Sequence, residues 1–226
     1  ARIEGVEVSR LDPPDFEVRG LAAEEVQRRI EEFAPDVLGV SCIFSPQYPL
    51  VREIVSRAKR ADPGLVTVAG GTHPTFLAER VLGELPELDF VVLGEGEESL
   101  RELLGAVERG GGYERIDGLA WRDGETIRLQ PKTRYIQDLD GLPFPARDLL
   151  DVGRYAKACI THGVFQDRPL VLSVTSSRGC PKRCLYCSSS VYWGRRFRPR
   201  SPENVLDELE ALRSRLGIEE IQFEDD

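Results

Sequence analysis

Apolar positions in residues 5–109 alternate between short continuous runs and helical spacings. The continuous runs are typical of parallel strands buried on both faces, and they lie at residues 37–42, 65–69 and 90–93. Apolar residues three or four positions apart predict helices around residues 26–33, 50–58, 76–82 and 100–107. Val6 and Val8 begin a further alternating strand. Because strand and helix alternate, we expect a parallel sheet with helices on both faces, a Rossmann-like α/β domain over residues 1–110.

Small and polar residues follow these predicted strands. Ser41 ends the first run, Gly70 and Gly71 follow the second, and Gly94 follows the third. Ligands of open parallel sheets bind at the carboxyl ends of the strands, and glycine lets a ligand approach the backbone closely. The sequence therefore predicts a ligand-binding edge at these residues. His73 follows the glycine pair, where it is either a ligand contact or a loop histidine satisfied by the backbone.

Charged residues near this edge have two interpretations each. Glu95 and Glu97 either serve the site or begin the next helix, whose N-terminus favours acidic side chains, and for Glu97 we favour the helix start. Arginines recur between Arg195 and Arg200. In an acidic chain they indicate contact with an anionic ligand or with the front domain rather than with nucleic acid.

The pattern changes after residue 110. Asp123-Gly124 between two apolar stretches predicts a β-hairpin, and the prolines of residues 142–145 favour an extended connector. We therefore interpret residues 111–165 as a hairpin and a linker. Residues 166–226 then predict a strand, a loop, a helix and a second strand, which is the opening of a (β/α) barrel. The helix is expected to begin after Ser201 and to end at Gly217.

Three cysteines lie within eight residues of the predicted loop, namely Cys180, Cys184 and Cys187. Three close thiolates on one loop can hold three irons of a [4Fe–4S] cluster and leave the fourth iron open for a substrate. Zinc is the alternative, but a structural zinc site needs a fourth ligand. The candidates for it are Cys159, His162, Cys42 and His73. Because no second pair of ligands is adjacent, the spacing favours the cluster.

The composition narrows the class of partner. Hydrophobic residues make up 41% and charged residues 31% of the chain, as in a soluble globular protein. The net charge of −9 argues against a nucleic-acid or membrane-surface partner. The sequence contains no apolar run long enough for a membrane-spanning helix and no signal-peptide pattern. We expect a cytoplasmic protein with a small-molecule substrate.

These motifs together resemble the cobalamin-dependent branch of the radical S-adenosylmethionine superfamily. The spacing of Cys180, Cys184 and Cys187, with Tyr186 before the last cysteine, is the signature of the superfamily. The branch is indicated by residues 70–74, 94–97, 139–145, 175–188, 198–203 and 223–226. The resemblance covers nearly the whole chain.

The resemblance implies a role for each part. The three cysteines would ligate the [4Fe–4S] cluster, and Tyr186 would lie near the adenine of S-adenosylmethionine. Ser41, Gly70, Gly71, His73 and Gly94 would face cobalamin. The reduced cluster would cleave S-adenosylmethionine to a 5′-deoxyadenosyl radical, with electrons from a reductant such as flavodoxin or ferredoxin. The outcome would be methylation, or rearrangement or cyclisation, of an unactivated carbon under anaerobic conditions.

Two other functions stay open. The front domain is a scaffold without a cofactor in one of them, and the chain is a zinc-stabilised binding module without catalysis in the other. The resemblance also implies that the chain is truncated at both ends, lacking the first strand of the corrinoid domain and the later strands of the barrel. The absence of methionine and the last residues, Asp225-Asp226, directly after a predicted strand, fit that interpretation. We therefore expect this chain alone to be poorly soluble and inactive in cleaving S-adenosylmethionine.

Overall fold

The computed structural model describes residues 21–152 and 171–225. The strand predicted at Val6 and Val8, and the candidate zinc ligands Cys159 and His162, lie outside the described residues. The described residues form two compact units. The larger comprises Leu21–Leu139 and Ser177–Arg198, and the smaller comprises residues 140–152, 171–176 and 199–225. No helix among the described residues is long and apolar enough to cross a membrane.

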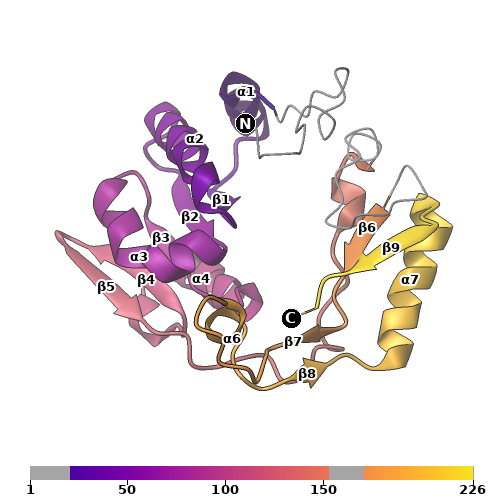
Figure 1. The fold of residues 1–226 in the computed structure, drawn as a ribbon. Coiled ribbons are helices and arrows are strands. Elements are labelled where there is room, and N and C mark those ends of the chain that lie inside the picture. Colours follow the sequence, from indigo (N-terminus) through magenta and orange to yellow (C-terminus); the bar gives the residue numbers. More distant parts are fainter. Residues whose placement is uncertain (1–20, 153–170, 226) are drawn as a thin grey trace, which may run out of the picture. The chain divides into compact units, whose positions relative to one another are not determined.

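The larger unit is built on a five-stranded sheet in the order β1-β2-β3-β4-β5 (Figure 1). The first three strands are parallel, and β4 and β5 extend the sheet as an antiparallel hairpin on β3. The strands are β1 (Val37–Ser41), β2 (Val66–Gly70), β3 (Phe90–Val92), β4 (Leu119–Asp123) and β5 (Thr126–Gln130). The predicted α/β fold with a parallel-rich sheet is confirmed, and the predicted hairpin belongs to the same sheet.

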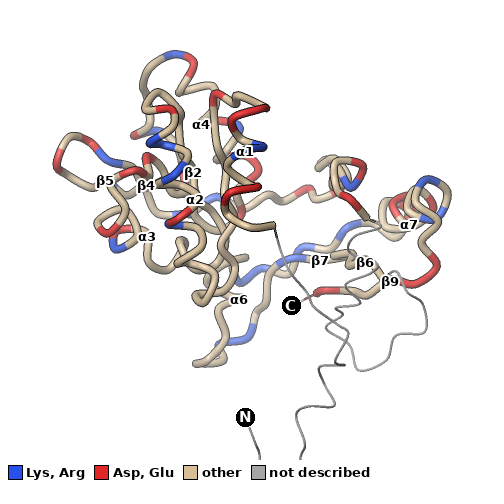
Figure 2. The backbone as a smooth tube through the Cα atoms, turned by 90° about the horizontal axis from the view of Figure 1, so that it is seen from above, with Lys and Arg blue, Asp and Glu red and all other residues tan. Residues whose placement is uncertain are grey.

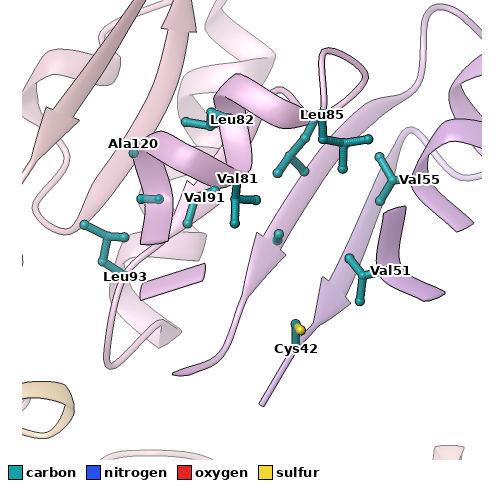
Figure 3. Close-up of a cluster of buried hydrophobic side chains, with 12 residues drawn as sticks. Cys42, Val51, Val55, Val81, Leu82, Leu85, Val91, Leu93 and Ala120 are labelled. Carbon is teal, nitrogen blue, oxygen red and sulfur yellow. The ribbon is translucent and has the colours of Figure 1, made fainter. Parts of the chain in front are cut away.

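Helices cover both faces of this sheet, as the sequence predicts. The covering helices are α2 (Tyr48–Ala61), α3 (Thr72–Glu84) and α4 (Glu97–Arg109), with short 3-10 turns η2 (Ser45–Gln47) and η3 (Tyr113–Arg115). The first helix, α1 (Ala23–Phe33), packs against α2 and has no buried residue. Alternate residues of β2 and β3 point to opposite faces, so Ala69 and Val91 meet α2 and α3 while Val68 and Phe90 meet α4. The sheet therefore has a hydrophobic core on each face. Figure 3 shows the core between the sheet and the helices α2 and α3, with Val55 and Leu82 among its side chains.

The outermost strand differs from its prediction. The apolar run of residues 37–42 predicts a strand buried on both faces, but β1 is only half-buried and Gly39 within it is exposed. The reason is its place in the sheet: β1 has β2 on one side, and no strand of the described residues pairs with its other side. Cys42, immediately after the strand, is fully buried and joins the core beneath α2.

The smaller unit has a strand–helix–strand arrangement. The strands β6 (Val171–Val174) and β9 (Glu220–Phe223) are parallel, with α7 (Pro202–Leu216) between them in sequence and η4 (Arg147–Leu149) before β6. The Ser201 side chain accepts a hydrogen bond from the N–H of Asn204 at 3.1 Å, which caps α7 as predicted. Gly217 ends the helix in a left-handed conformation with φ of 66°, also as predicted.

The cysteines lie on a segment between the two short strands β7 (Ser177–Arg178) and β8 (Arg198–Pro199), which pair with each other. This segment, residues 179–197, is called the cysteine loop below, and it contains one helical turn, α6 (Ser189–Tyr192). It belongs to the larger unit and thus to the same compact body as the parallel sheet. The boundaries proposed at residues 110 and 165 stay predictions.

Candidate cofactor-binding site

The carboxyl ends of β1 and β2 lie directly beside each other. Ser41 and Gly70 are partners in the parallel register, and the N–H of Cys42 donates to the carbonyl oxygen of Gly70 at 2.8 Å. The N–H of His73 in turn donates to the carbonyl oxygen of Cys42 at 3.1 Å. Gly94 follows β3 at the same edge, because β2 and β3 are also parallel. The structure therefore brings together the strand-end residues that the sequence places at a ligand-binding edge.

The two glycines at the carboxyl end of β2 differ in what their positions allow. Gly71 has a φ of +97°, and a Cβ there would lie 2.7 Å from the carbonyl oxygen of Cys42, so the backbone itself excludes a side chain. Gly70 has room, because a Cβ would meet nothing closer than the carbonyl oxygen of Val92 at 3.8 Å. A side chain at Gly70 would thus begin at an ordinary contact distance, so the backbone there does not itself require glycine. A glycine at a strand end allows close approach of a flat ligand such as a corrinoid.

His73 is held by neighbouring side chains. Its Nδ1 lies 2.9 Å from Oγ of Ser45, and its ring centroid lies 4.7 Å from that of Tyr48. Its Nε2 is buried and has no hydrogen-bond partner among the described residues. In the interpretation of His73 as a loop histidine the partner would be the backbone; the structure instead gives one nitrogen a serine hydroxyl, and the other nitrogen has no partner among the described residues. A contact of His73 with cobalamin stays a prediction.

The cysteine loop begins and ends with close backbone approaches. The N–H of Cys180 donates to the carbonyl oxygen of Gly194 at 3.2 Å, which closes the loop. Gly179 has a φ of +91°, and a Cβ there would overlap the carbonyl oxygen of Arg196. Within the loop, the N–H of Cys187 donates to the carbonyl oxygen of Cys184 at 3.2 Å in a tight turn. The first and last residues of the cysteine loop are therefore held close to each other, with the cysteines between them in sequence.

The three thiols are accessible but do not converge. Cys184 and Cys187 are exposed and Cys180 is half-buried, and none is in a disulfide. Tyr186 between them is 93% exposed. Within residues 21–152 and 171–225, no group of three or more His, Cys, Asp or Glu side chains is arranged to hold a metal ion. The donor set nevertheless fits an iron–sulfur cluster, because three accessible thiols on one short loop are the ligands that such a cluster uses.

The end of β3 lies next to the second half of the loop. A Cβ on Gly94, whose φ is +60°, would lie 3.0 Å from the carbonyl oxygen of Tyr192 in α6. The hydroxyl of Tyr135 donates to the carbonyl oxygen of Val191 at 3.2 Å. Burial raises the pKa of Tyr192 first of all, and the acidic side chains of Glu97 and Glu95 act in the same direction. The cysteine loop therefore packs at the carboxyl-terminal edge of the parallel strands, where the sequence predicts ligand binding.

A buried carboxylate at this edge has a role that the sequence did not reveal. Glu95 is fully buried, and Arg178 and Arg198 donate to it at 2.7 and 3.0 Å. The N–H of Ile136 donates to the same carboxylate at 2.8 Å. Glu97 begins α4, as predicted, and also accepts from Arg178 at 2.7 Å. An acidic residue at a strand end and arginines on both sides of the cysteines were the available signals.

Basic residues recur along β7 and the cysteine loop (Figure 2). Burial opposes the charged form of Arg178, but its hydrogen bonds to Glu97 and Glu95 outweigh that effect and raise its pKa. Its guanidinium also lies 4.9 Å from the ring centroid of Trp193. The arginines between Arg195 and Arg200 had two interpretations, contact with an anionic ligand or contact with the front domain. Arg198 makes the second kind of contact, because it pairs with Glu95 of that domain.

Two families match different parts of the sequence. Residues 1–104 match the B12 binding domain, and residues 174–225 match the radical SAM superfamily, in which SAM is S-adenosylmethionine. The chain belongs to the cobalamin-dependent radical SAM family. The second match contains Cys180, Cys184 and Cys187, and the first contains Ser41, Gly70, Gly71, His73 and Gly94.

Curated relatives of this family include methyltransferases and cyclases. An uncharacterised methyltransferase of Pyrococcus horikoshii is 35% identical over 91% of this chain and 43% of the relative. Cytidylyl-2-hydroxyethylphosphonate methyltransferase of Streptomyces wedmorensis is 30% identical over 92% of this chain and 42% of the relative. Anaerobic magnesium-protoporphyrin IX monomethyl ester cyclase of Rubrivivax gelatinosus is 32% identical over 88% and 35%. The chain thus spans less than half the length of each of these relatives.

Solved structures share the fold. The cobalamin-dependent S-adenosylmethionine radical enzyme OxsB, with aqua-cobalamin and S-adenosylmethionine bound, matches with a TM-score of 0.74 and 22% identity over 92% of this chain and 28% of that chain. The radical S-adenosylmethionine methyltransferase TsrM of Kitasatospora setae, with cobalamin and a [4Fe-4S] cluster bound, matches with a TM-score of 0.70 and 20% identity over 90% and 40%. At these identities the likeness shows the fold alone.

Proposed function

We propose that this chain is the cofactor-binding part of a radical SAM enzyme that uses cobalamin to methylate, rearrange or cyclise an unactivated carbon of a small molecule. The observation that carries the proposal is the position of the cysteine loop. It holds the three-cysteine signature, lies within the radical SAM match, and packs in the same compact unit as the B12-type sheet. One unit therefore contains the candidate residues for all three cofactors.

Within this proposal, each part of the chain has a defined task. Cys180, Cys184 and Cys187 are the cluster ligands, and the exposed ring of Tyr186 is available to the adenine of S-adenosylmethionine. At the strand ends, Ser41, Gly70, Gly71, His73 and Gly94 are the residues that would face the corrinoid. Gly70 adds no side chain there, and one nitrogen of the His73 ring lacks a partner among the described residues. When bound, the cluster would supply one electron for cleavage of S-adenosylmethionine to methionine and a 5′-deoxyadenosyl radical, and cobalamin would carry the methyl group if the reaction is a methylation.

The first test is the identity of the metal. The protein in its natural length, incubated anaerobically with iron and sulfide, is expected to take up about four irons per chain with matching acid-labile sulfide. With a one-electron donor such as flavodoxin or ferredoxin, it is expected to convert S-adenosylmethionine to 5′-deoxyadenosine. Stoichiometric zinc without labile sulfide would instead support the zinc-binding module and contradict the proposal.

Gly70 provides a separate test of cobalamin binding. A leucine there adds a side chain at the strand end where the proposal places the corrinoid, so we expect cobalamin affinity to fall at least about tenfold. Gly71 is unsuitable, because its positive φ makes any substitution strained whether or not a ligand binds. The measurement is retention of cobalamin through gel filtration, followed by titration of the bound fraction.

The matched control is Gly39→Leu. Gly39 lies within β1, and a Cβ there meets no atom within 4 Å, so the same substitution is accommodated away from the strand ends. We expect Gly39→Leu to retain cobalamin like the wild type. If the wild type itself loses cobalamin on the column, the front domain is a scaffold. If both variants bind as the wild type does, cobalamin does not use the space at Gly70.

A further inference from the structure

Glu95 connects three segments that are distant in sequence. Its carboxylate is fully buried after β3, and it accepts hydrogen bonds from Arg178, Arg198 and the backbone N–H of Ile136. Arg198 is itself only 2% exposed at its side chain and bonds both carboxylate oxygens at 3.0 Å. Water therefore does not compete for the bonds of Arg198, whose charge depends on this carboxylate, while Arg178 is also paired with Glu97.

The two arginines stand at the two ends of the cysteine loop. Arg178 lies in β7, two residues before Cys180, and Arg198 lies in β8, where the loop ends. Arg198 also donates to the carbonyl oxygen of Trp193 at 2.7 Å, and Arg178 lies over the Trp193 ring. The carboxylate of Glu95 thus binds the arginines on both sides of the cysteine loop. Through these arginines it is also linked to Trp193 inside the loop.

We propose that Glu95 is a positioning residue that fixes the cysteine loop on the ligand-binding edge of the B12-type sheet. It thereby sets where the three thiols stand relative to Gly94 and the other strand ends. That the loop holds a cluster and the edge holds cobalamin rests on the proposed function; the anchoring itself rests on the contacts. Glu97 adds a weaker contact to Arg178, because its side chain is 41% exposed.

A second buried carboxylate provides a matched control. Glu208 is also buried, with a side chain 3% exposed, and it is bonded by Arg147 and Arg200 at 2.5 Å each. It lies in the smaller unit, which does not include the cysteine loop. Glu95→Gln and Glu208→Gln therefore make the same chemical change in the same kind of environment, and only the first change is made at the loop.

The experiment measures amide hydrogen exchange in the protein of natural length without cofactors. In Glu95→Gln, the amides of Cys180 and Cys187 are expected to exchange at least about tenfold faster, because their hydrogen bonds within the loop open more often. In Glu208→Gln, these two amides exchange as in the wild type. Unchanged exchange in Glu95→Gln, or equal acceleration in both variants, overturns the proposal.

Two further variants guard against general unfolding. Arg178→Gln removes the ion pair between Arg178 and Glu95 and leaves the pair between Arg198 and Glu95. It is expected to accelerate amide exchange at Cys180 while the amides of β2 stay protected. Glu95→Asp keeps the charge and is expected to restore most of the protection at Cys180. Loss of protection in β2 as large as that in the loop would show that Glu95 holds the whole unit together rather than the loop, and would also overturn the proposal.

A spectroscopic readout tests positioning itself. After loading with iron, sulfide and cobalamin, Glu95→Gln is expected to retain about four irons, since all three thiols remain. The magnetic coupling between the reduced cluster and cob(II)alamin is expected to become weaker and heterogeneous in its electron paramagnetic resonance spectrum. A coupling identical to that of the wild type overturns the proposal. Absence of iron from the wild type refutes the proposed function instead, and the exchange measurement then still decides the role of Glu95.

Discussion

Replacing Cys184 with alanine is expected to abolish cluster binding. Cys184 is exposed in the middle of the loop, and the turn that joins it to Cys187 is closed by one backbone hydrogen bond. A cluster ligated by three thiolates has no spare protein ligand, so removing one leaves two irons without a protein bond. We expect the iron content to fall from about four per chain to near zero after anaerobic reconstitution and desalting.

A thiol outside the loop serves as the control. Cys42 is fully buried after β1 and is not in a disulfide. Cys42→Ala removes one cysteine without touching the loop, and we expect it to retain the full iron and labile sulfide of the wild type. Equal loss of iron from both variants would show that iron uptake follows thiol content rather than the motif. Full retention by Cys184→Ala would contradict the ligand assignment.

The periodicity of apolar residues predicted most elements of the larger unit because most of them bury one side against their neighbours. The spacing of Val51, Val55 and Ala58 in α2 is an example, since all three are buried against the sheet. An exception is α1, since it has no buried residue. What the pattern did not contain is which strand lies at the edge. Residues 37–42 are as apolar as the inner strands, and only the strand order shows that β1 is half-buried.

The site was predictable to the extent that its residues are local in sequence. The three cysteines are close to one another because they lie on one short loop. The strand-end glycines are close to one another because parallel strands end at the same edge of the sheet. Glu95 was not predictable in this way, because its partners Arg178 and Arg198 are 83 and 103 residues away. A buried ion pair at that separation depends on how the loop folds back onto the sheet, which no local pattern encodes.

Replacing Glu208 with alanine is expected to destabilise the smaller unit strongly. Arg147 and Arg200 have side chains only 13% and 11% exposed, and both donate to this carboxylate. Removing it leaves two largely buried cations without their anion, a change that costs about 3–5 kcal/mol when one partner of a buried pair is lost. Arg147 and Arg200 also bond the carbonyl oxygens of Ser173 and Thr175, so the loss is expected to spread to β6.

Native-state hydrogen exchange of the amides in β6 and β9 measures this effect within the unit concerned. We expect their opening free energy to fall by about 3–5 kcal/mol in Glu208→Ala. The control is Glu210→Ala on the same helix, an exposed position where the same substitution is expected to change stability by no more than about 0.5 kcal/mol. A fall below about 1 kcal/mol in Glu208→Ala would show that water reaches the two arginines and screens their charges once the carboxylate is gone.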